Sequence, residues 1–238
     1  MDLQTLMALP TVIIPGYLAG AAPYAPMVGH LKQHGITAVT VPLTRGSWFP
    51  TLGGRSVQPI LAAIANTVSR LKADTGCDRV NLVGHSAGGW IARIYLGEHP
   101  YDTHAVDQNR QNCWAGRQQV HTLLTLGTPH TSQERWTRRN LDFVNQTYPG
   151  AFYESLRYVC VASKAVYGQR WRTWFTYNSY QLTSGEGATW GDGITPVEAA
   201  HLEGAENLTL GDVYHSPKPG AAWYGSAEIV TQWAKYLH

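Results

Sequence analysis

Three polar side chains, far apart along the chain, are of the types that together activate a hydroxyl group. Ser86 lies in the pentapeptide Gly-His-Ser-Ala-Gly at residues 84–88, which follows an apolar run at 80–83 and precedes a helix-like run at 90–96. A serine flanked by small residues at a strand-to-helix turn projects its hydroxyl above the sheet, an arrangement typical of a nucleophile elbow. We therefore expect Ser86 to act as a nucleophile.

A serine hydroxyl is a weak nucleophile at neutral pH, so it needs a nearby base and an acid that orients the base. Where the serine occupies such a turn, the usual chain order is serine, acid, histidine. His215 follows the last predicted strand and precedes the last predicted helix, which is the position the base requires. Asp192 lies in the turn Gly-Asp-Gly-Ile-Thr-Pro at residues 191–196, and Asp212 is the alternative acid. Because Asp212 shares a short loop with His215 and would reach its far nitrogen poorly, we expect a triad of Ser86, Asp192 and His215.

Two backbone groups could complete this chemistry. Acyl transfer through a serine forms an oxyanion that needs two hydrogen-bond donors, one from the residue after the nucleophile and one from the loop after an early strand. The N–H groups of Ala87 and Tyr17 occupy these positions, so we expect them to form an oxyanion hole. We expect His85 to pack or hydrogen-bond beneath the turn, and we also count it among the residues near a substrate pocket.

The elements that must position these residues alternate between strands and helices. Short apolar runs bounded by turn residues predict strands, and apolar positions at helical spacing predict amphipathic helices. The predicted strands are residues 11–14, 38–41, 79–83, 120–126, 158–162 and 208–210. The predicted helices are residues 26–35, 55–75 and 227–237. This alternation predicts an α/β fold with a doubly wound, mostly parallel sheet, in a single domain spanning residues 1–238.

The interval 130–190 departs from the alternation and holds half of the chain's aromatic residues in about a quarter of its length. We expect it to form an inserted cap or lid, broken by the strand near residue 159. Its aromatic rings either line an apolar pocket or bury the cap against the sheet, and the sequence leaves both readings open. The residues we assign to a substrate pocket are Tyr17, His85, Trp136, Phe152, Trp171 and Trp174.

The same interval contains three arginines, Arg135, Arg138 and Arg139. They form either a solvated helical face or a site that attracts anionic lipid.

Composition limits the range of partners. The net charge of +2 and the absence of long basic runs argue against nucleic acid as a partner. No residue pattern calls for a metal or a cofactor. The first residues resemble no secretory signal, no apolar run would span a bilayer, and the three cysteines form no C-x-x-C pair. We therefore expect a cytoplasmic location, or a plastid if the source is a plant.

Three motifs resemble those of a known family. They are Gly-His-Ser-Ala-Gly-Gly at residues 84–89, Leu-Gly-Thr-Pro-His at 126–130, and Gly-Asp-Gly-Ile-Thr-Pro at 191–196 leading to His215. Together they resemble the α/β-hydrolase superfamily and, within it, the lipase-like and GPI-inositol-deacylase-like branch. The sequence around Ser86 is also similar to a group of cyanobacterial and plastid hydrolases.

The resemblance implies an α/β-hydrolase fold and ester hydrolysis. Combined with the triad, it predicts a serine hydrolase that cleaves carboxylic, lipid-like esters through an acyl-enzyme, with peripheral contact to a membrane as an accompanying expectation. Two alternatives stay open. One is an acyltransferase, in which an alcohol intercepts the acyl-enzyme because the lid excludes water. The other is a hydrolase-fold binding protein without catalytic activity.

Overall fold

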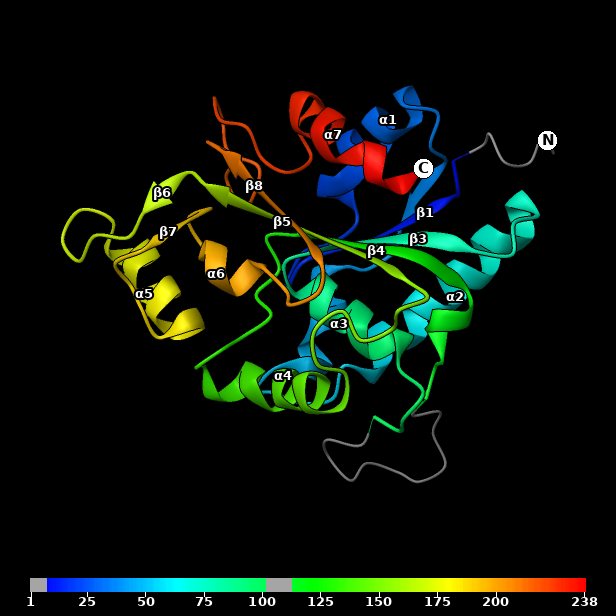
Figure 1. The fold of residues 1–238 in the computed structure, drawn as a ribbon, viewed down its shortest axis with the longest axis horizontal. Coiled ribbons are helices and arrows are strands. Elements are labelled where there is room, and N and C mark those ends of the chain that lie inside the picture. The colour runs from blue at the N-terminus through cyan, green and yellow to red at the C-terminus, as the bar shows by residue number, and fades with distance from the viewer. Residues whose placement is uncertain (1–7, 102–112) are drawn as a thin grey trace.

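A six-stranded sheet forms the centre of the molecule. The computed structural model describes residues 8–101 and 113–238, and for Trp136 it describes the backbone alone. The strand order is β2-β1-β3-β4-β5-β8, and all five neighbouring pairs are parallel (Figure 1). These strands are β1 (Thr11–Ile14), β2 (Ala38–Thr40), β3 (Val80–His85), β4 (Val120–Leu126), β5 (Arg157–Lys164) and β8 (Glu206–Gly211). A separate antiparallel pair joins β6 (Val166–Tyr167) to β7 (Trp190–Gly191).

Helices cover both faces of the sheet (Figure 1). The α-helices of the described residues are α1 (Ala25–Gln33), α2 (Gln58–Thr75), α3 (Ala87–Leu96), α4 (Arg135–Thr147), α5 (Trp174–Ser184), α6 (Val197–Ala200) and α7 (Ala227–Trp233). Helices α1 and α7 lie on one face, and α2, α3 and α4 lie on the other (Figure 1). Helix α5, β6 and β7 form a separate projection beyond the end of β5, at the left of Figure 1.

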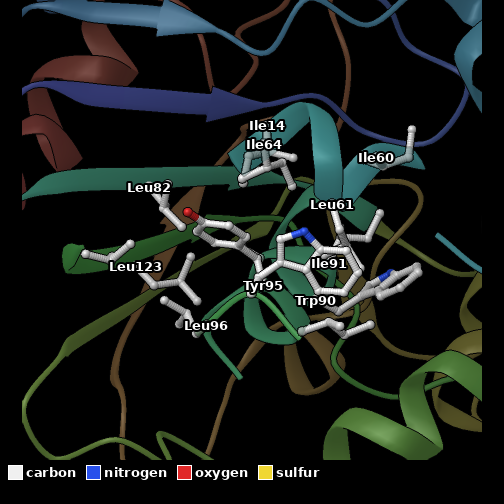
Figure 2. Close-up of a cluster of buried hydrophobic side chains, with 14 of the residues drawn as sticks. Ile14, Ile60, Leu61, Ile64, Leu82, Trp90, Ile91, Tyr95, Leu96 and Leu123 are labelled. Carbon is white, nitrogen blue, oxygen red and sulfur yellow. The ribbon is translucent and has the colours of Figure 1, made fainter. Parts of the chain in front are cut away.

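The sequence builds this sandwich because the central strands are apolar on both faces. All residues of β1 and β3 are buried, as expected for parallel strands covered by helices on each side. Helix α2 presents one apolar stripe to the sheet and ends at Gly76, which has a left-handed φ of 68° that suits glycine. Ile60, Leu61 and Ile64 of this stripe pack with Trp90 and Ile91 of α3 in the cluster shown in Figure 2.

The predicted fold class is confirmed, because each predicted strand and helix corresponds to an element of the observed parallel α/β sandwich. The last predicted helix is divided into α7 and a 3₁₀ helix, Ala234–Leu237. The interval 130–190 is also divided: β5 runs through it as a full sheet strand, with α4 on its N-terminal side and the β6–α5–β7 projection on the other. Within the two described ranges, no helix is both long and apolar enough to cross a membrane.

Candidate active site

Ser86 lies at a strained turn between β3 and α3. Its φ of 52° and ψ of −126° are rare for a residue with a side chain. The turn is this tight because neighbouring glycines allow close approach: a methyl group at Gly88 would meet the Ile14 carbonyl, and one at Gly89 would overlap Thr128. The chain therefore turns sharply where β3 meets the end of β1, and strain is concentrated at the one serine in the motif.

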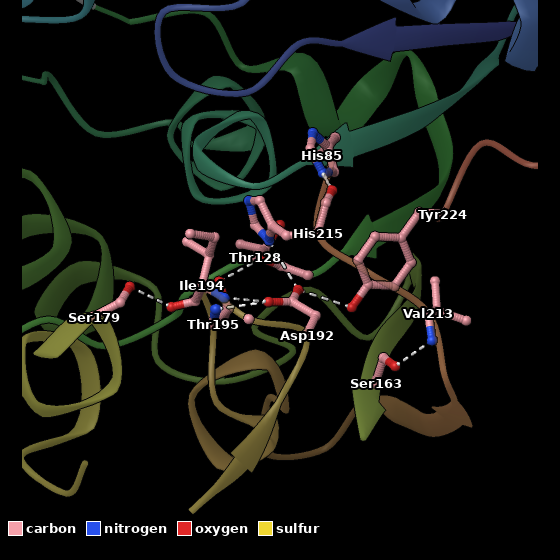
Figure 3. A network of polar contacts seen from close by, with 12 residues as sticks. His85, Thr128, Ser163, Ser179, Asp192, Ile194, Thr195, Val213, His215 and Tyr224 are labelled. Carbon is pink, nitrogen blue, oxygen red and sulfur yellow. Dashed lines mark hydrogen bonds and ion pairs between the residues drawn. The ribbon is translucent and has the colours of Figure 1, made fainter. Parts of the chain in front are cut away.

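Asp192 and His215 form a buried pair. His215 Nδ1 lies 2.8 Å from Asp192 Oδ2, and both side chains are almost fully enclosed (Figure 3). The other carboxylate oxygen accepts the backbone N–H groups of Ile194 at 3.0 Å and Thr195 at 2.7 Å. Tyr224 donates its hydroxyl to Asp192 Oδ2 at 3.0 Å. Four donors thus fix the carboxylate, which in turn fixes the imidazole and leaves Nδ1 as the protonated nitrogen.

The structure pairs His215 with Asp192, the first of the two acids considered from the sequence. Asp212 lies on the same loop as His215, but its φ of 56° turns that loop at the end of β8. The backbone N–H of Asp212 donates to the Lys164 carbonyl at 3.4 Å, and its side chain is exposed.

His85 links three parts of the site beneath the Ser86 turn. Its Nε2 lies 2.8 Å from the backbone carbonyl of His215, so Nε2 carries the hydrogen and donates. Its Nδ1 then accepts the Tyr24 hydroxyl at 2.7 Å, and that hydroxyl accepts the Gly16 N–H at 2.8 Å. Complete burial, reinforced by the neighbouring His215, lowers the pKa of His85 to about 3. His85 is therefore neutral at physiological pH and connects the loop after β1 to the loop after β8.

The same contacts hold His215 against His85, the residue before Ser86. The rings of His85 and His215 lie with centroids 4.8 Å apart, and His85 directly precedes Ser86. His215 is also held through its backbone, since its N–H donates to the Asp192 carbonyl at 3.0 Å. Among the described residues, no hydrogen bond joins the Ser86 hydroxyl to His215. Such bonds are often long before substrate binds and shorten in the reactive complex.

The residues predicted to supply the oxyanion donors, Tyr17 and Ala87, belong to two elements and line one cavity with Ser86. Ala87 is the first residue of α3, where the backbone N–H groups lack partners within the helix and the helix dipole favours negative charge. Gly16 lies against Ser86 so closely that a methyl group on it would lie 3.0 Å from Ser86 Cβ, and Tyr17 follows it. The next residue, Leu18, again has a left-handed φ of 56°. The loop after β1 is therefore strained and held against the start of α3.

Two cavities open on either side of these residues. The first, of about 770 Å³, is lined by Ser86 and Ala87 together with mostly apolar side chains that include Tyr17, Trp48 and Leu52. The second, of about 620 Å³, is lined by Asp192, His215, Trp174, Phe175, Arg172 and Lys218. The site therefore has an apolar side at the serine and a more basic side at the histidine.

The residues predicted to line a substrate pocket separate into two groups. Tyr17 lines the first cavity and Trp174 lines the second. The side chain of Trp136 lies outside the described part of the structure.

His85, Phe152 and Trp171 line neither of these two cavities, so their place in a substrate pocket stays a prediction. His85 is held beneath the Ser86 turn by the bonds given above. Phe152 packs edge-on against Tyr148 and Tyr153, away from the site. Trp171 lies in the loop before α5 with 89% of its surface exposed.

Two supporting residues were missed by sequence reasoning. Tyr24 and Tyr224 come from opposite ends of the chain, and each contributes a hydroxyl hydrogen bond to the site and a ring contact to His85. A tyrosine among apolar residues carries no sequence signal for such a role. In the two described ranges, no cluster of three His, Cys, Asp or Glu side chains could hold a metal ion.

Comparison with solved structures extends the fold assignment. Phospholipase PlaB from Legionella pneumophila matches 96% of this chain with a TM-score of 0.62 and 13% identity, and the match spans 60% of the PlaB chain. The product of the lin2722 gene of Listeria innocua matches over 96% of this chain and 94% of its own, with a TM-score of 0.53 and 14% identity. Aspergillus fumigatus lipase B matches 85% of this chain with a lower TM-score of 0.47 and 13% identity, and the match spans 44% of the lipase chain.

At these identities the likeness concerns the fold. The six-stranded parallel sheet, its flanking helices and the neighbours together give this chain the α/β-hydrolase fold. No protein-family model and no curated protein sequence matches the chain. The narrower resemblance to GPI-inositol deacylases stays a prediction.

Proposed function

Because the chain has the α/β-hydrolase fold, we propose that it is a serine hydrolase that cleaves carboxylic, lipid-like esters through an acyl-enzyme. The observation that carries the proposal is the buried His215–Asp192 pair, 2.8 Å between Nδ1 and Oδ2, beside the strained turn that presents Ser86. A fold likeness alone would not support a catalytic role, since one fold hosts many functions. The phospholipase among the structural neighbours makes a lipid ester the first substrate class to test.

In the proposed reaction, Ser86 Oγ attacks the ester carbonyl carbon while its proton passes to His215 Nε2. Asp192 stabilises the imidazolium that forms, and the N–H groups of Tyr17 and Ala87 bind the oxyanion of the tetrahedral intermediate. The intermediate collapses as the bond to the alcohol oxygen breaks, and His215 returns the proton to the departing alkoxide. Water then attacks the acyl-enzyme with the same proton transfers, which releases the carboxylic acid and restores Ser86.

The two cavities suggest how an ester would lie across the site. The first cavity borders Ser86 and Ala87 and is lined by Trp48, Phe49 and Leu52, so it suits an acyl chain. The second borders His215, the group that would protonate the leaving oxygen, so it suits the alcohol part of the ester.

Hydrolysis of p-nitrophenyl esters of increasing acyl length, by the parent protein and by Ser86→Ala, tests the proposal. We expect turnover that depends on acyl length in the parent and none above the uncatalysed rate in the variant. Equal activity in both proteins would remove Ser86 from the mechanism. Product analysis with an added alcohol distinguishes hydrolysis from acyl transfer, since a transferase would yield the new ester. A protein that turns over no ester and forms no covalent adduct at Ser86 would instead be a binding protein.

A further inference from the structure

Three large apolar rings lie in water on the loop and helix that follow β6. Trp171, Trp174 and Phe175 are 89%, 64% and 67% exposed, within five consecutive residues. Single exposed apolar residues need no explanation, whereas a contiguous group of this kind marks an interaction site. We call residues 170–175, which add Arg170 and Arg172 to these rings, the aromatic rim.

The exposure of the rim is imposed by a rigid loop. Thr173 Oγ1 accepts the N–H of Gln169 at 2.6 Å and donates to the carbonyl of Tyr167 at 2.9 Å. The Thr173 N–H donates in turn to the Gln169 carbonyl at 3.0 Å. These bonds close the loop around Thr173, in which Trp171 is exposed to solvent. The loop lies between β6 and α5, in the projection at the left of Figure 1. The backbone that carries the indole is therefore ordered before a partner binds, which reduces the conformational entropy that the loop loses on binding.

The rim is joined to the candidate active site. Arg172, Trp174 and Phe175 line the same cavity as His215. Helix α5, which begins at Trp174, is tied to the turn that carries Asp192: Ser179 donates to the Ile194 carbonyl at 2.7 Å (Figure 3). A surface that contacts the rim would thus lie across the mouth of the histidine side of the site.

The charge of the aromatic rim indicates which kind of surface it would bind. Arg170 and Arg172 flank Trp171, and residues 165–185 contain no acidic residue. Within the described residues neither arginine forms an ion pair. By contrast, Arg138 on α4 is paired with Asp142 at 3.3 Å. Tryptophan and phenylalanine interleaved with arginine are typical of segments that lie at the interface of anionic membranes.

A second copy of this chain fits the rim less well. Two identical rims facing each other across a two-fold axis would bring four arginines together with no acidic residue of the rim to offset them. We therefore propose that the aromatic rim docks on an anionic lipid surface and holds the cavity beside His215 against it. This inference rests on the proposed function, which supplies the reason for a lipid surface at the site.

Vesicle binding tests the inference without catalysis. Ser86→Ala protein, which leaves lipid intact, is sedimented with phosphatidylcholine vesicles with and without phosphatidylglycerol. Binding should be stronger with phosphatidylglycerol and should weaken with salt. Trp171→Ala in this background should lower the partition coefficient about tenfold, since a largely exposed indole leaves the interface. Arg170→Gln should lower it about fivefold on the anionic vesicles alone.

Two matched variants control for general effects. Phe152→Ala removes another exposed ring, and Arg79→Gln another exposed arginine, both away from the rim. Both should bind vesicles as the Ser86→Ala protein does. Trp171→Ala in the otherwise unchanged chain should hydrolyse soluble p-nitrophenyl acetate at the parent rate, because Trp171 lines neither cavity.

Three results would each refute the proposal that the aromatic rim docks on an anionic lipid surface. They are an absence of binding to anionic vesicles, equal losses in the control variants, or a dimer that Trp171→Ala dissociates. A different result separates the two proposals: vesicle binding that depends on Trp171, in a chain that hydrolyses no ester, would refute the proposed function and leave the docking surface in place.

Discussion

Replacing His85 with glutamine tests whether His85 is buried and neutral beneath Ser86. The measured quantity is the free energy of unfolding at several pH values. In the folded protein His85 donates to the His215 carbonyl and accepts from Tyr24, and burial with the nearby His215 lowers its pKa from 6.5 to about 3. The unfolded chain therefore binds a proton at this residue over a pH range in which the folded protein does not. Because of this difference, the free energy of unfolding falls as the pH falls from 6.5 towards 3.

The size of the effect follows from the two pKa values. Between the two pKa values, 6.5 and about 3, each unit by which the pH falls lowers the free energy of unfolding by about 1.4 kcal/mol. Between pH 7 and pH 5 the part of this loss attributable to His85 is about 2 kcal/mol. Glutamine can still donate an amide hydrogen near the His215 carbonyl but does not titrate. His85→Gln should therefore lose about 2 kcal/mol less than the parent over this pH interval, although its stability at pH 7 is itself lower.

Urea unfolding of both proteins at pH 5, 7 and 8 measures the difference. Other buried histidines, such as His130, whose pKa burial and Arg93 also lower well below 6.5, contribute equally to both proteins and cancel. Between pH 7 and 8 the two stability curves should run nearly parallel, because His85 is mostly neutral in both states there. Identical losses between pH 7 and 5 in parent and variant would refute the assignment of a buried, neutral His85.

Four further changes have defined outcomes. Asp192→Asn should lower kcat by about 10⁴ in an ester assay, because the imidazole loses its orienting anion; an undiminished rate would exclude Asp192 as the acid. Tyr224→Phe removes one donor to that carboxylate and should lower kcat about fivefold with KM unchanged, measured with the same ester. Gly89→Ala forces a methyl group against Thr128 and should lower the free energy of unfolding by about 1–3 kcal/mol, seen in urea titrations. Leu52→Trp narrows the first cavity and should raise KM for long acyl esters more than for short ones; an equal change for both would place the acyl chain elsewhere.

The sheet was predictable from the sequence because its central strands are buried on both faces. Such strands are rich in apolar residues and are bounded by turn residues, so β1, β3 and β4 were predictable from short apolar runs. The turn at Ser86 was predictable for a related reason, since the glycines that its packing requires stand next to the serine in the chain.

Contacts between distant residues were not predictable in the same way. Tyr24 and His85 are 61 residues apart, and Tyr224 meets Asp192 across 32 residues, with nothing in the local sequence to indicate either bond. The aromatic residues of the interval 130–190 were recognised as a group, but their exposure depends on tertiary details. Trp171 points into water because Thr173 closes its loop, and neither composition nor periodicity reports such a closure.

Covalent labelling tests the central claim most directly. We propose that Ser86 is a nucleophile activated by His215 and Asp192, so a fluorophosphonate probe should add once to the parent chain, and peptide mapping should place the adduct on Ser86. Ser86→Ala should gain no mass under the same conditions, and Asp192→Asn should react far more slowly than the parent. An unlabelled parent, or an adduct that persists in Ser86→Ala, would contradict the account.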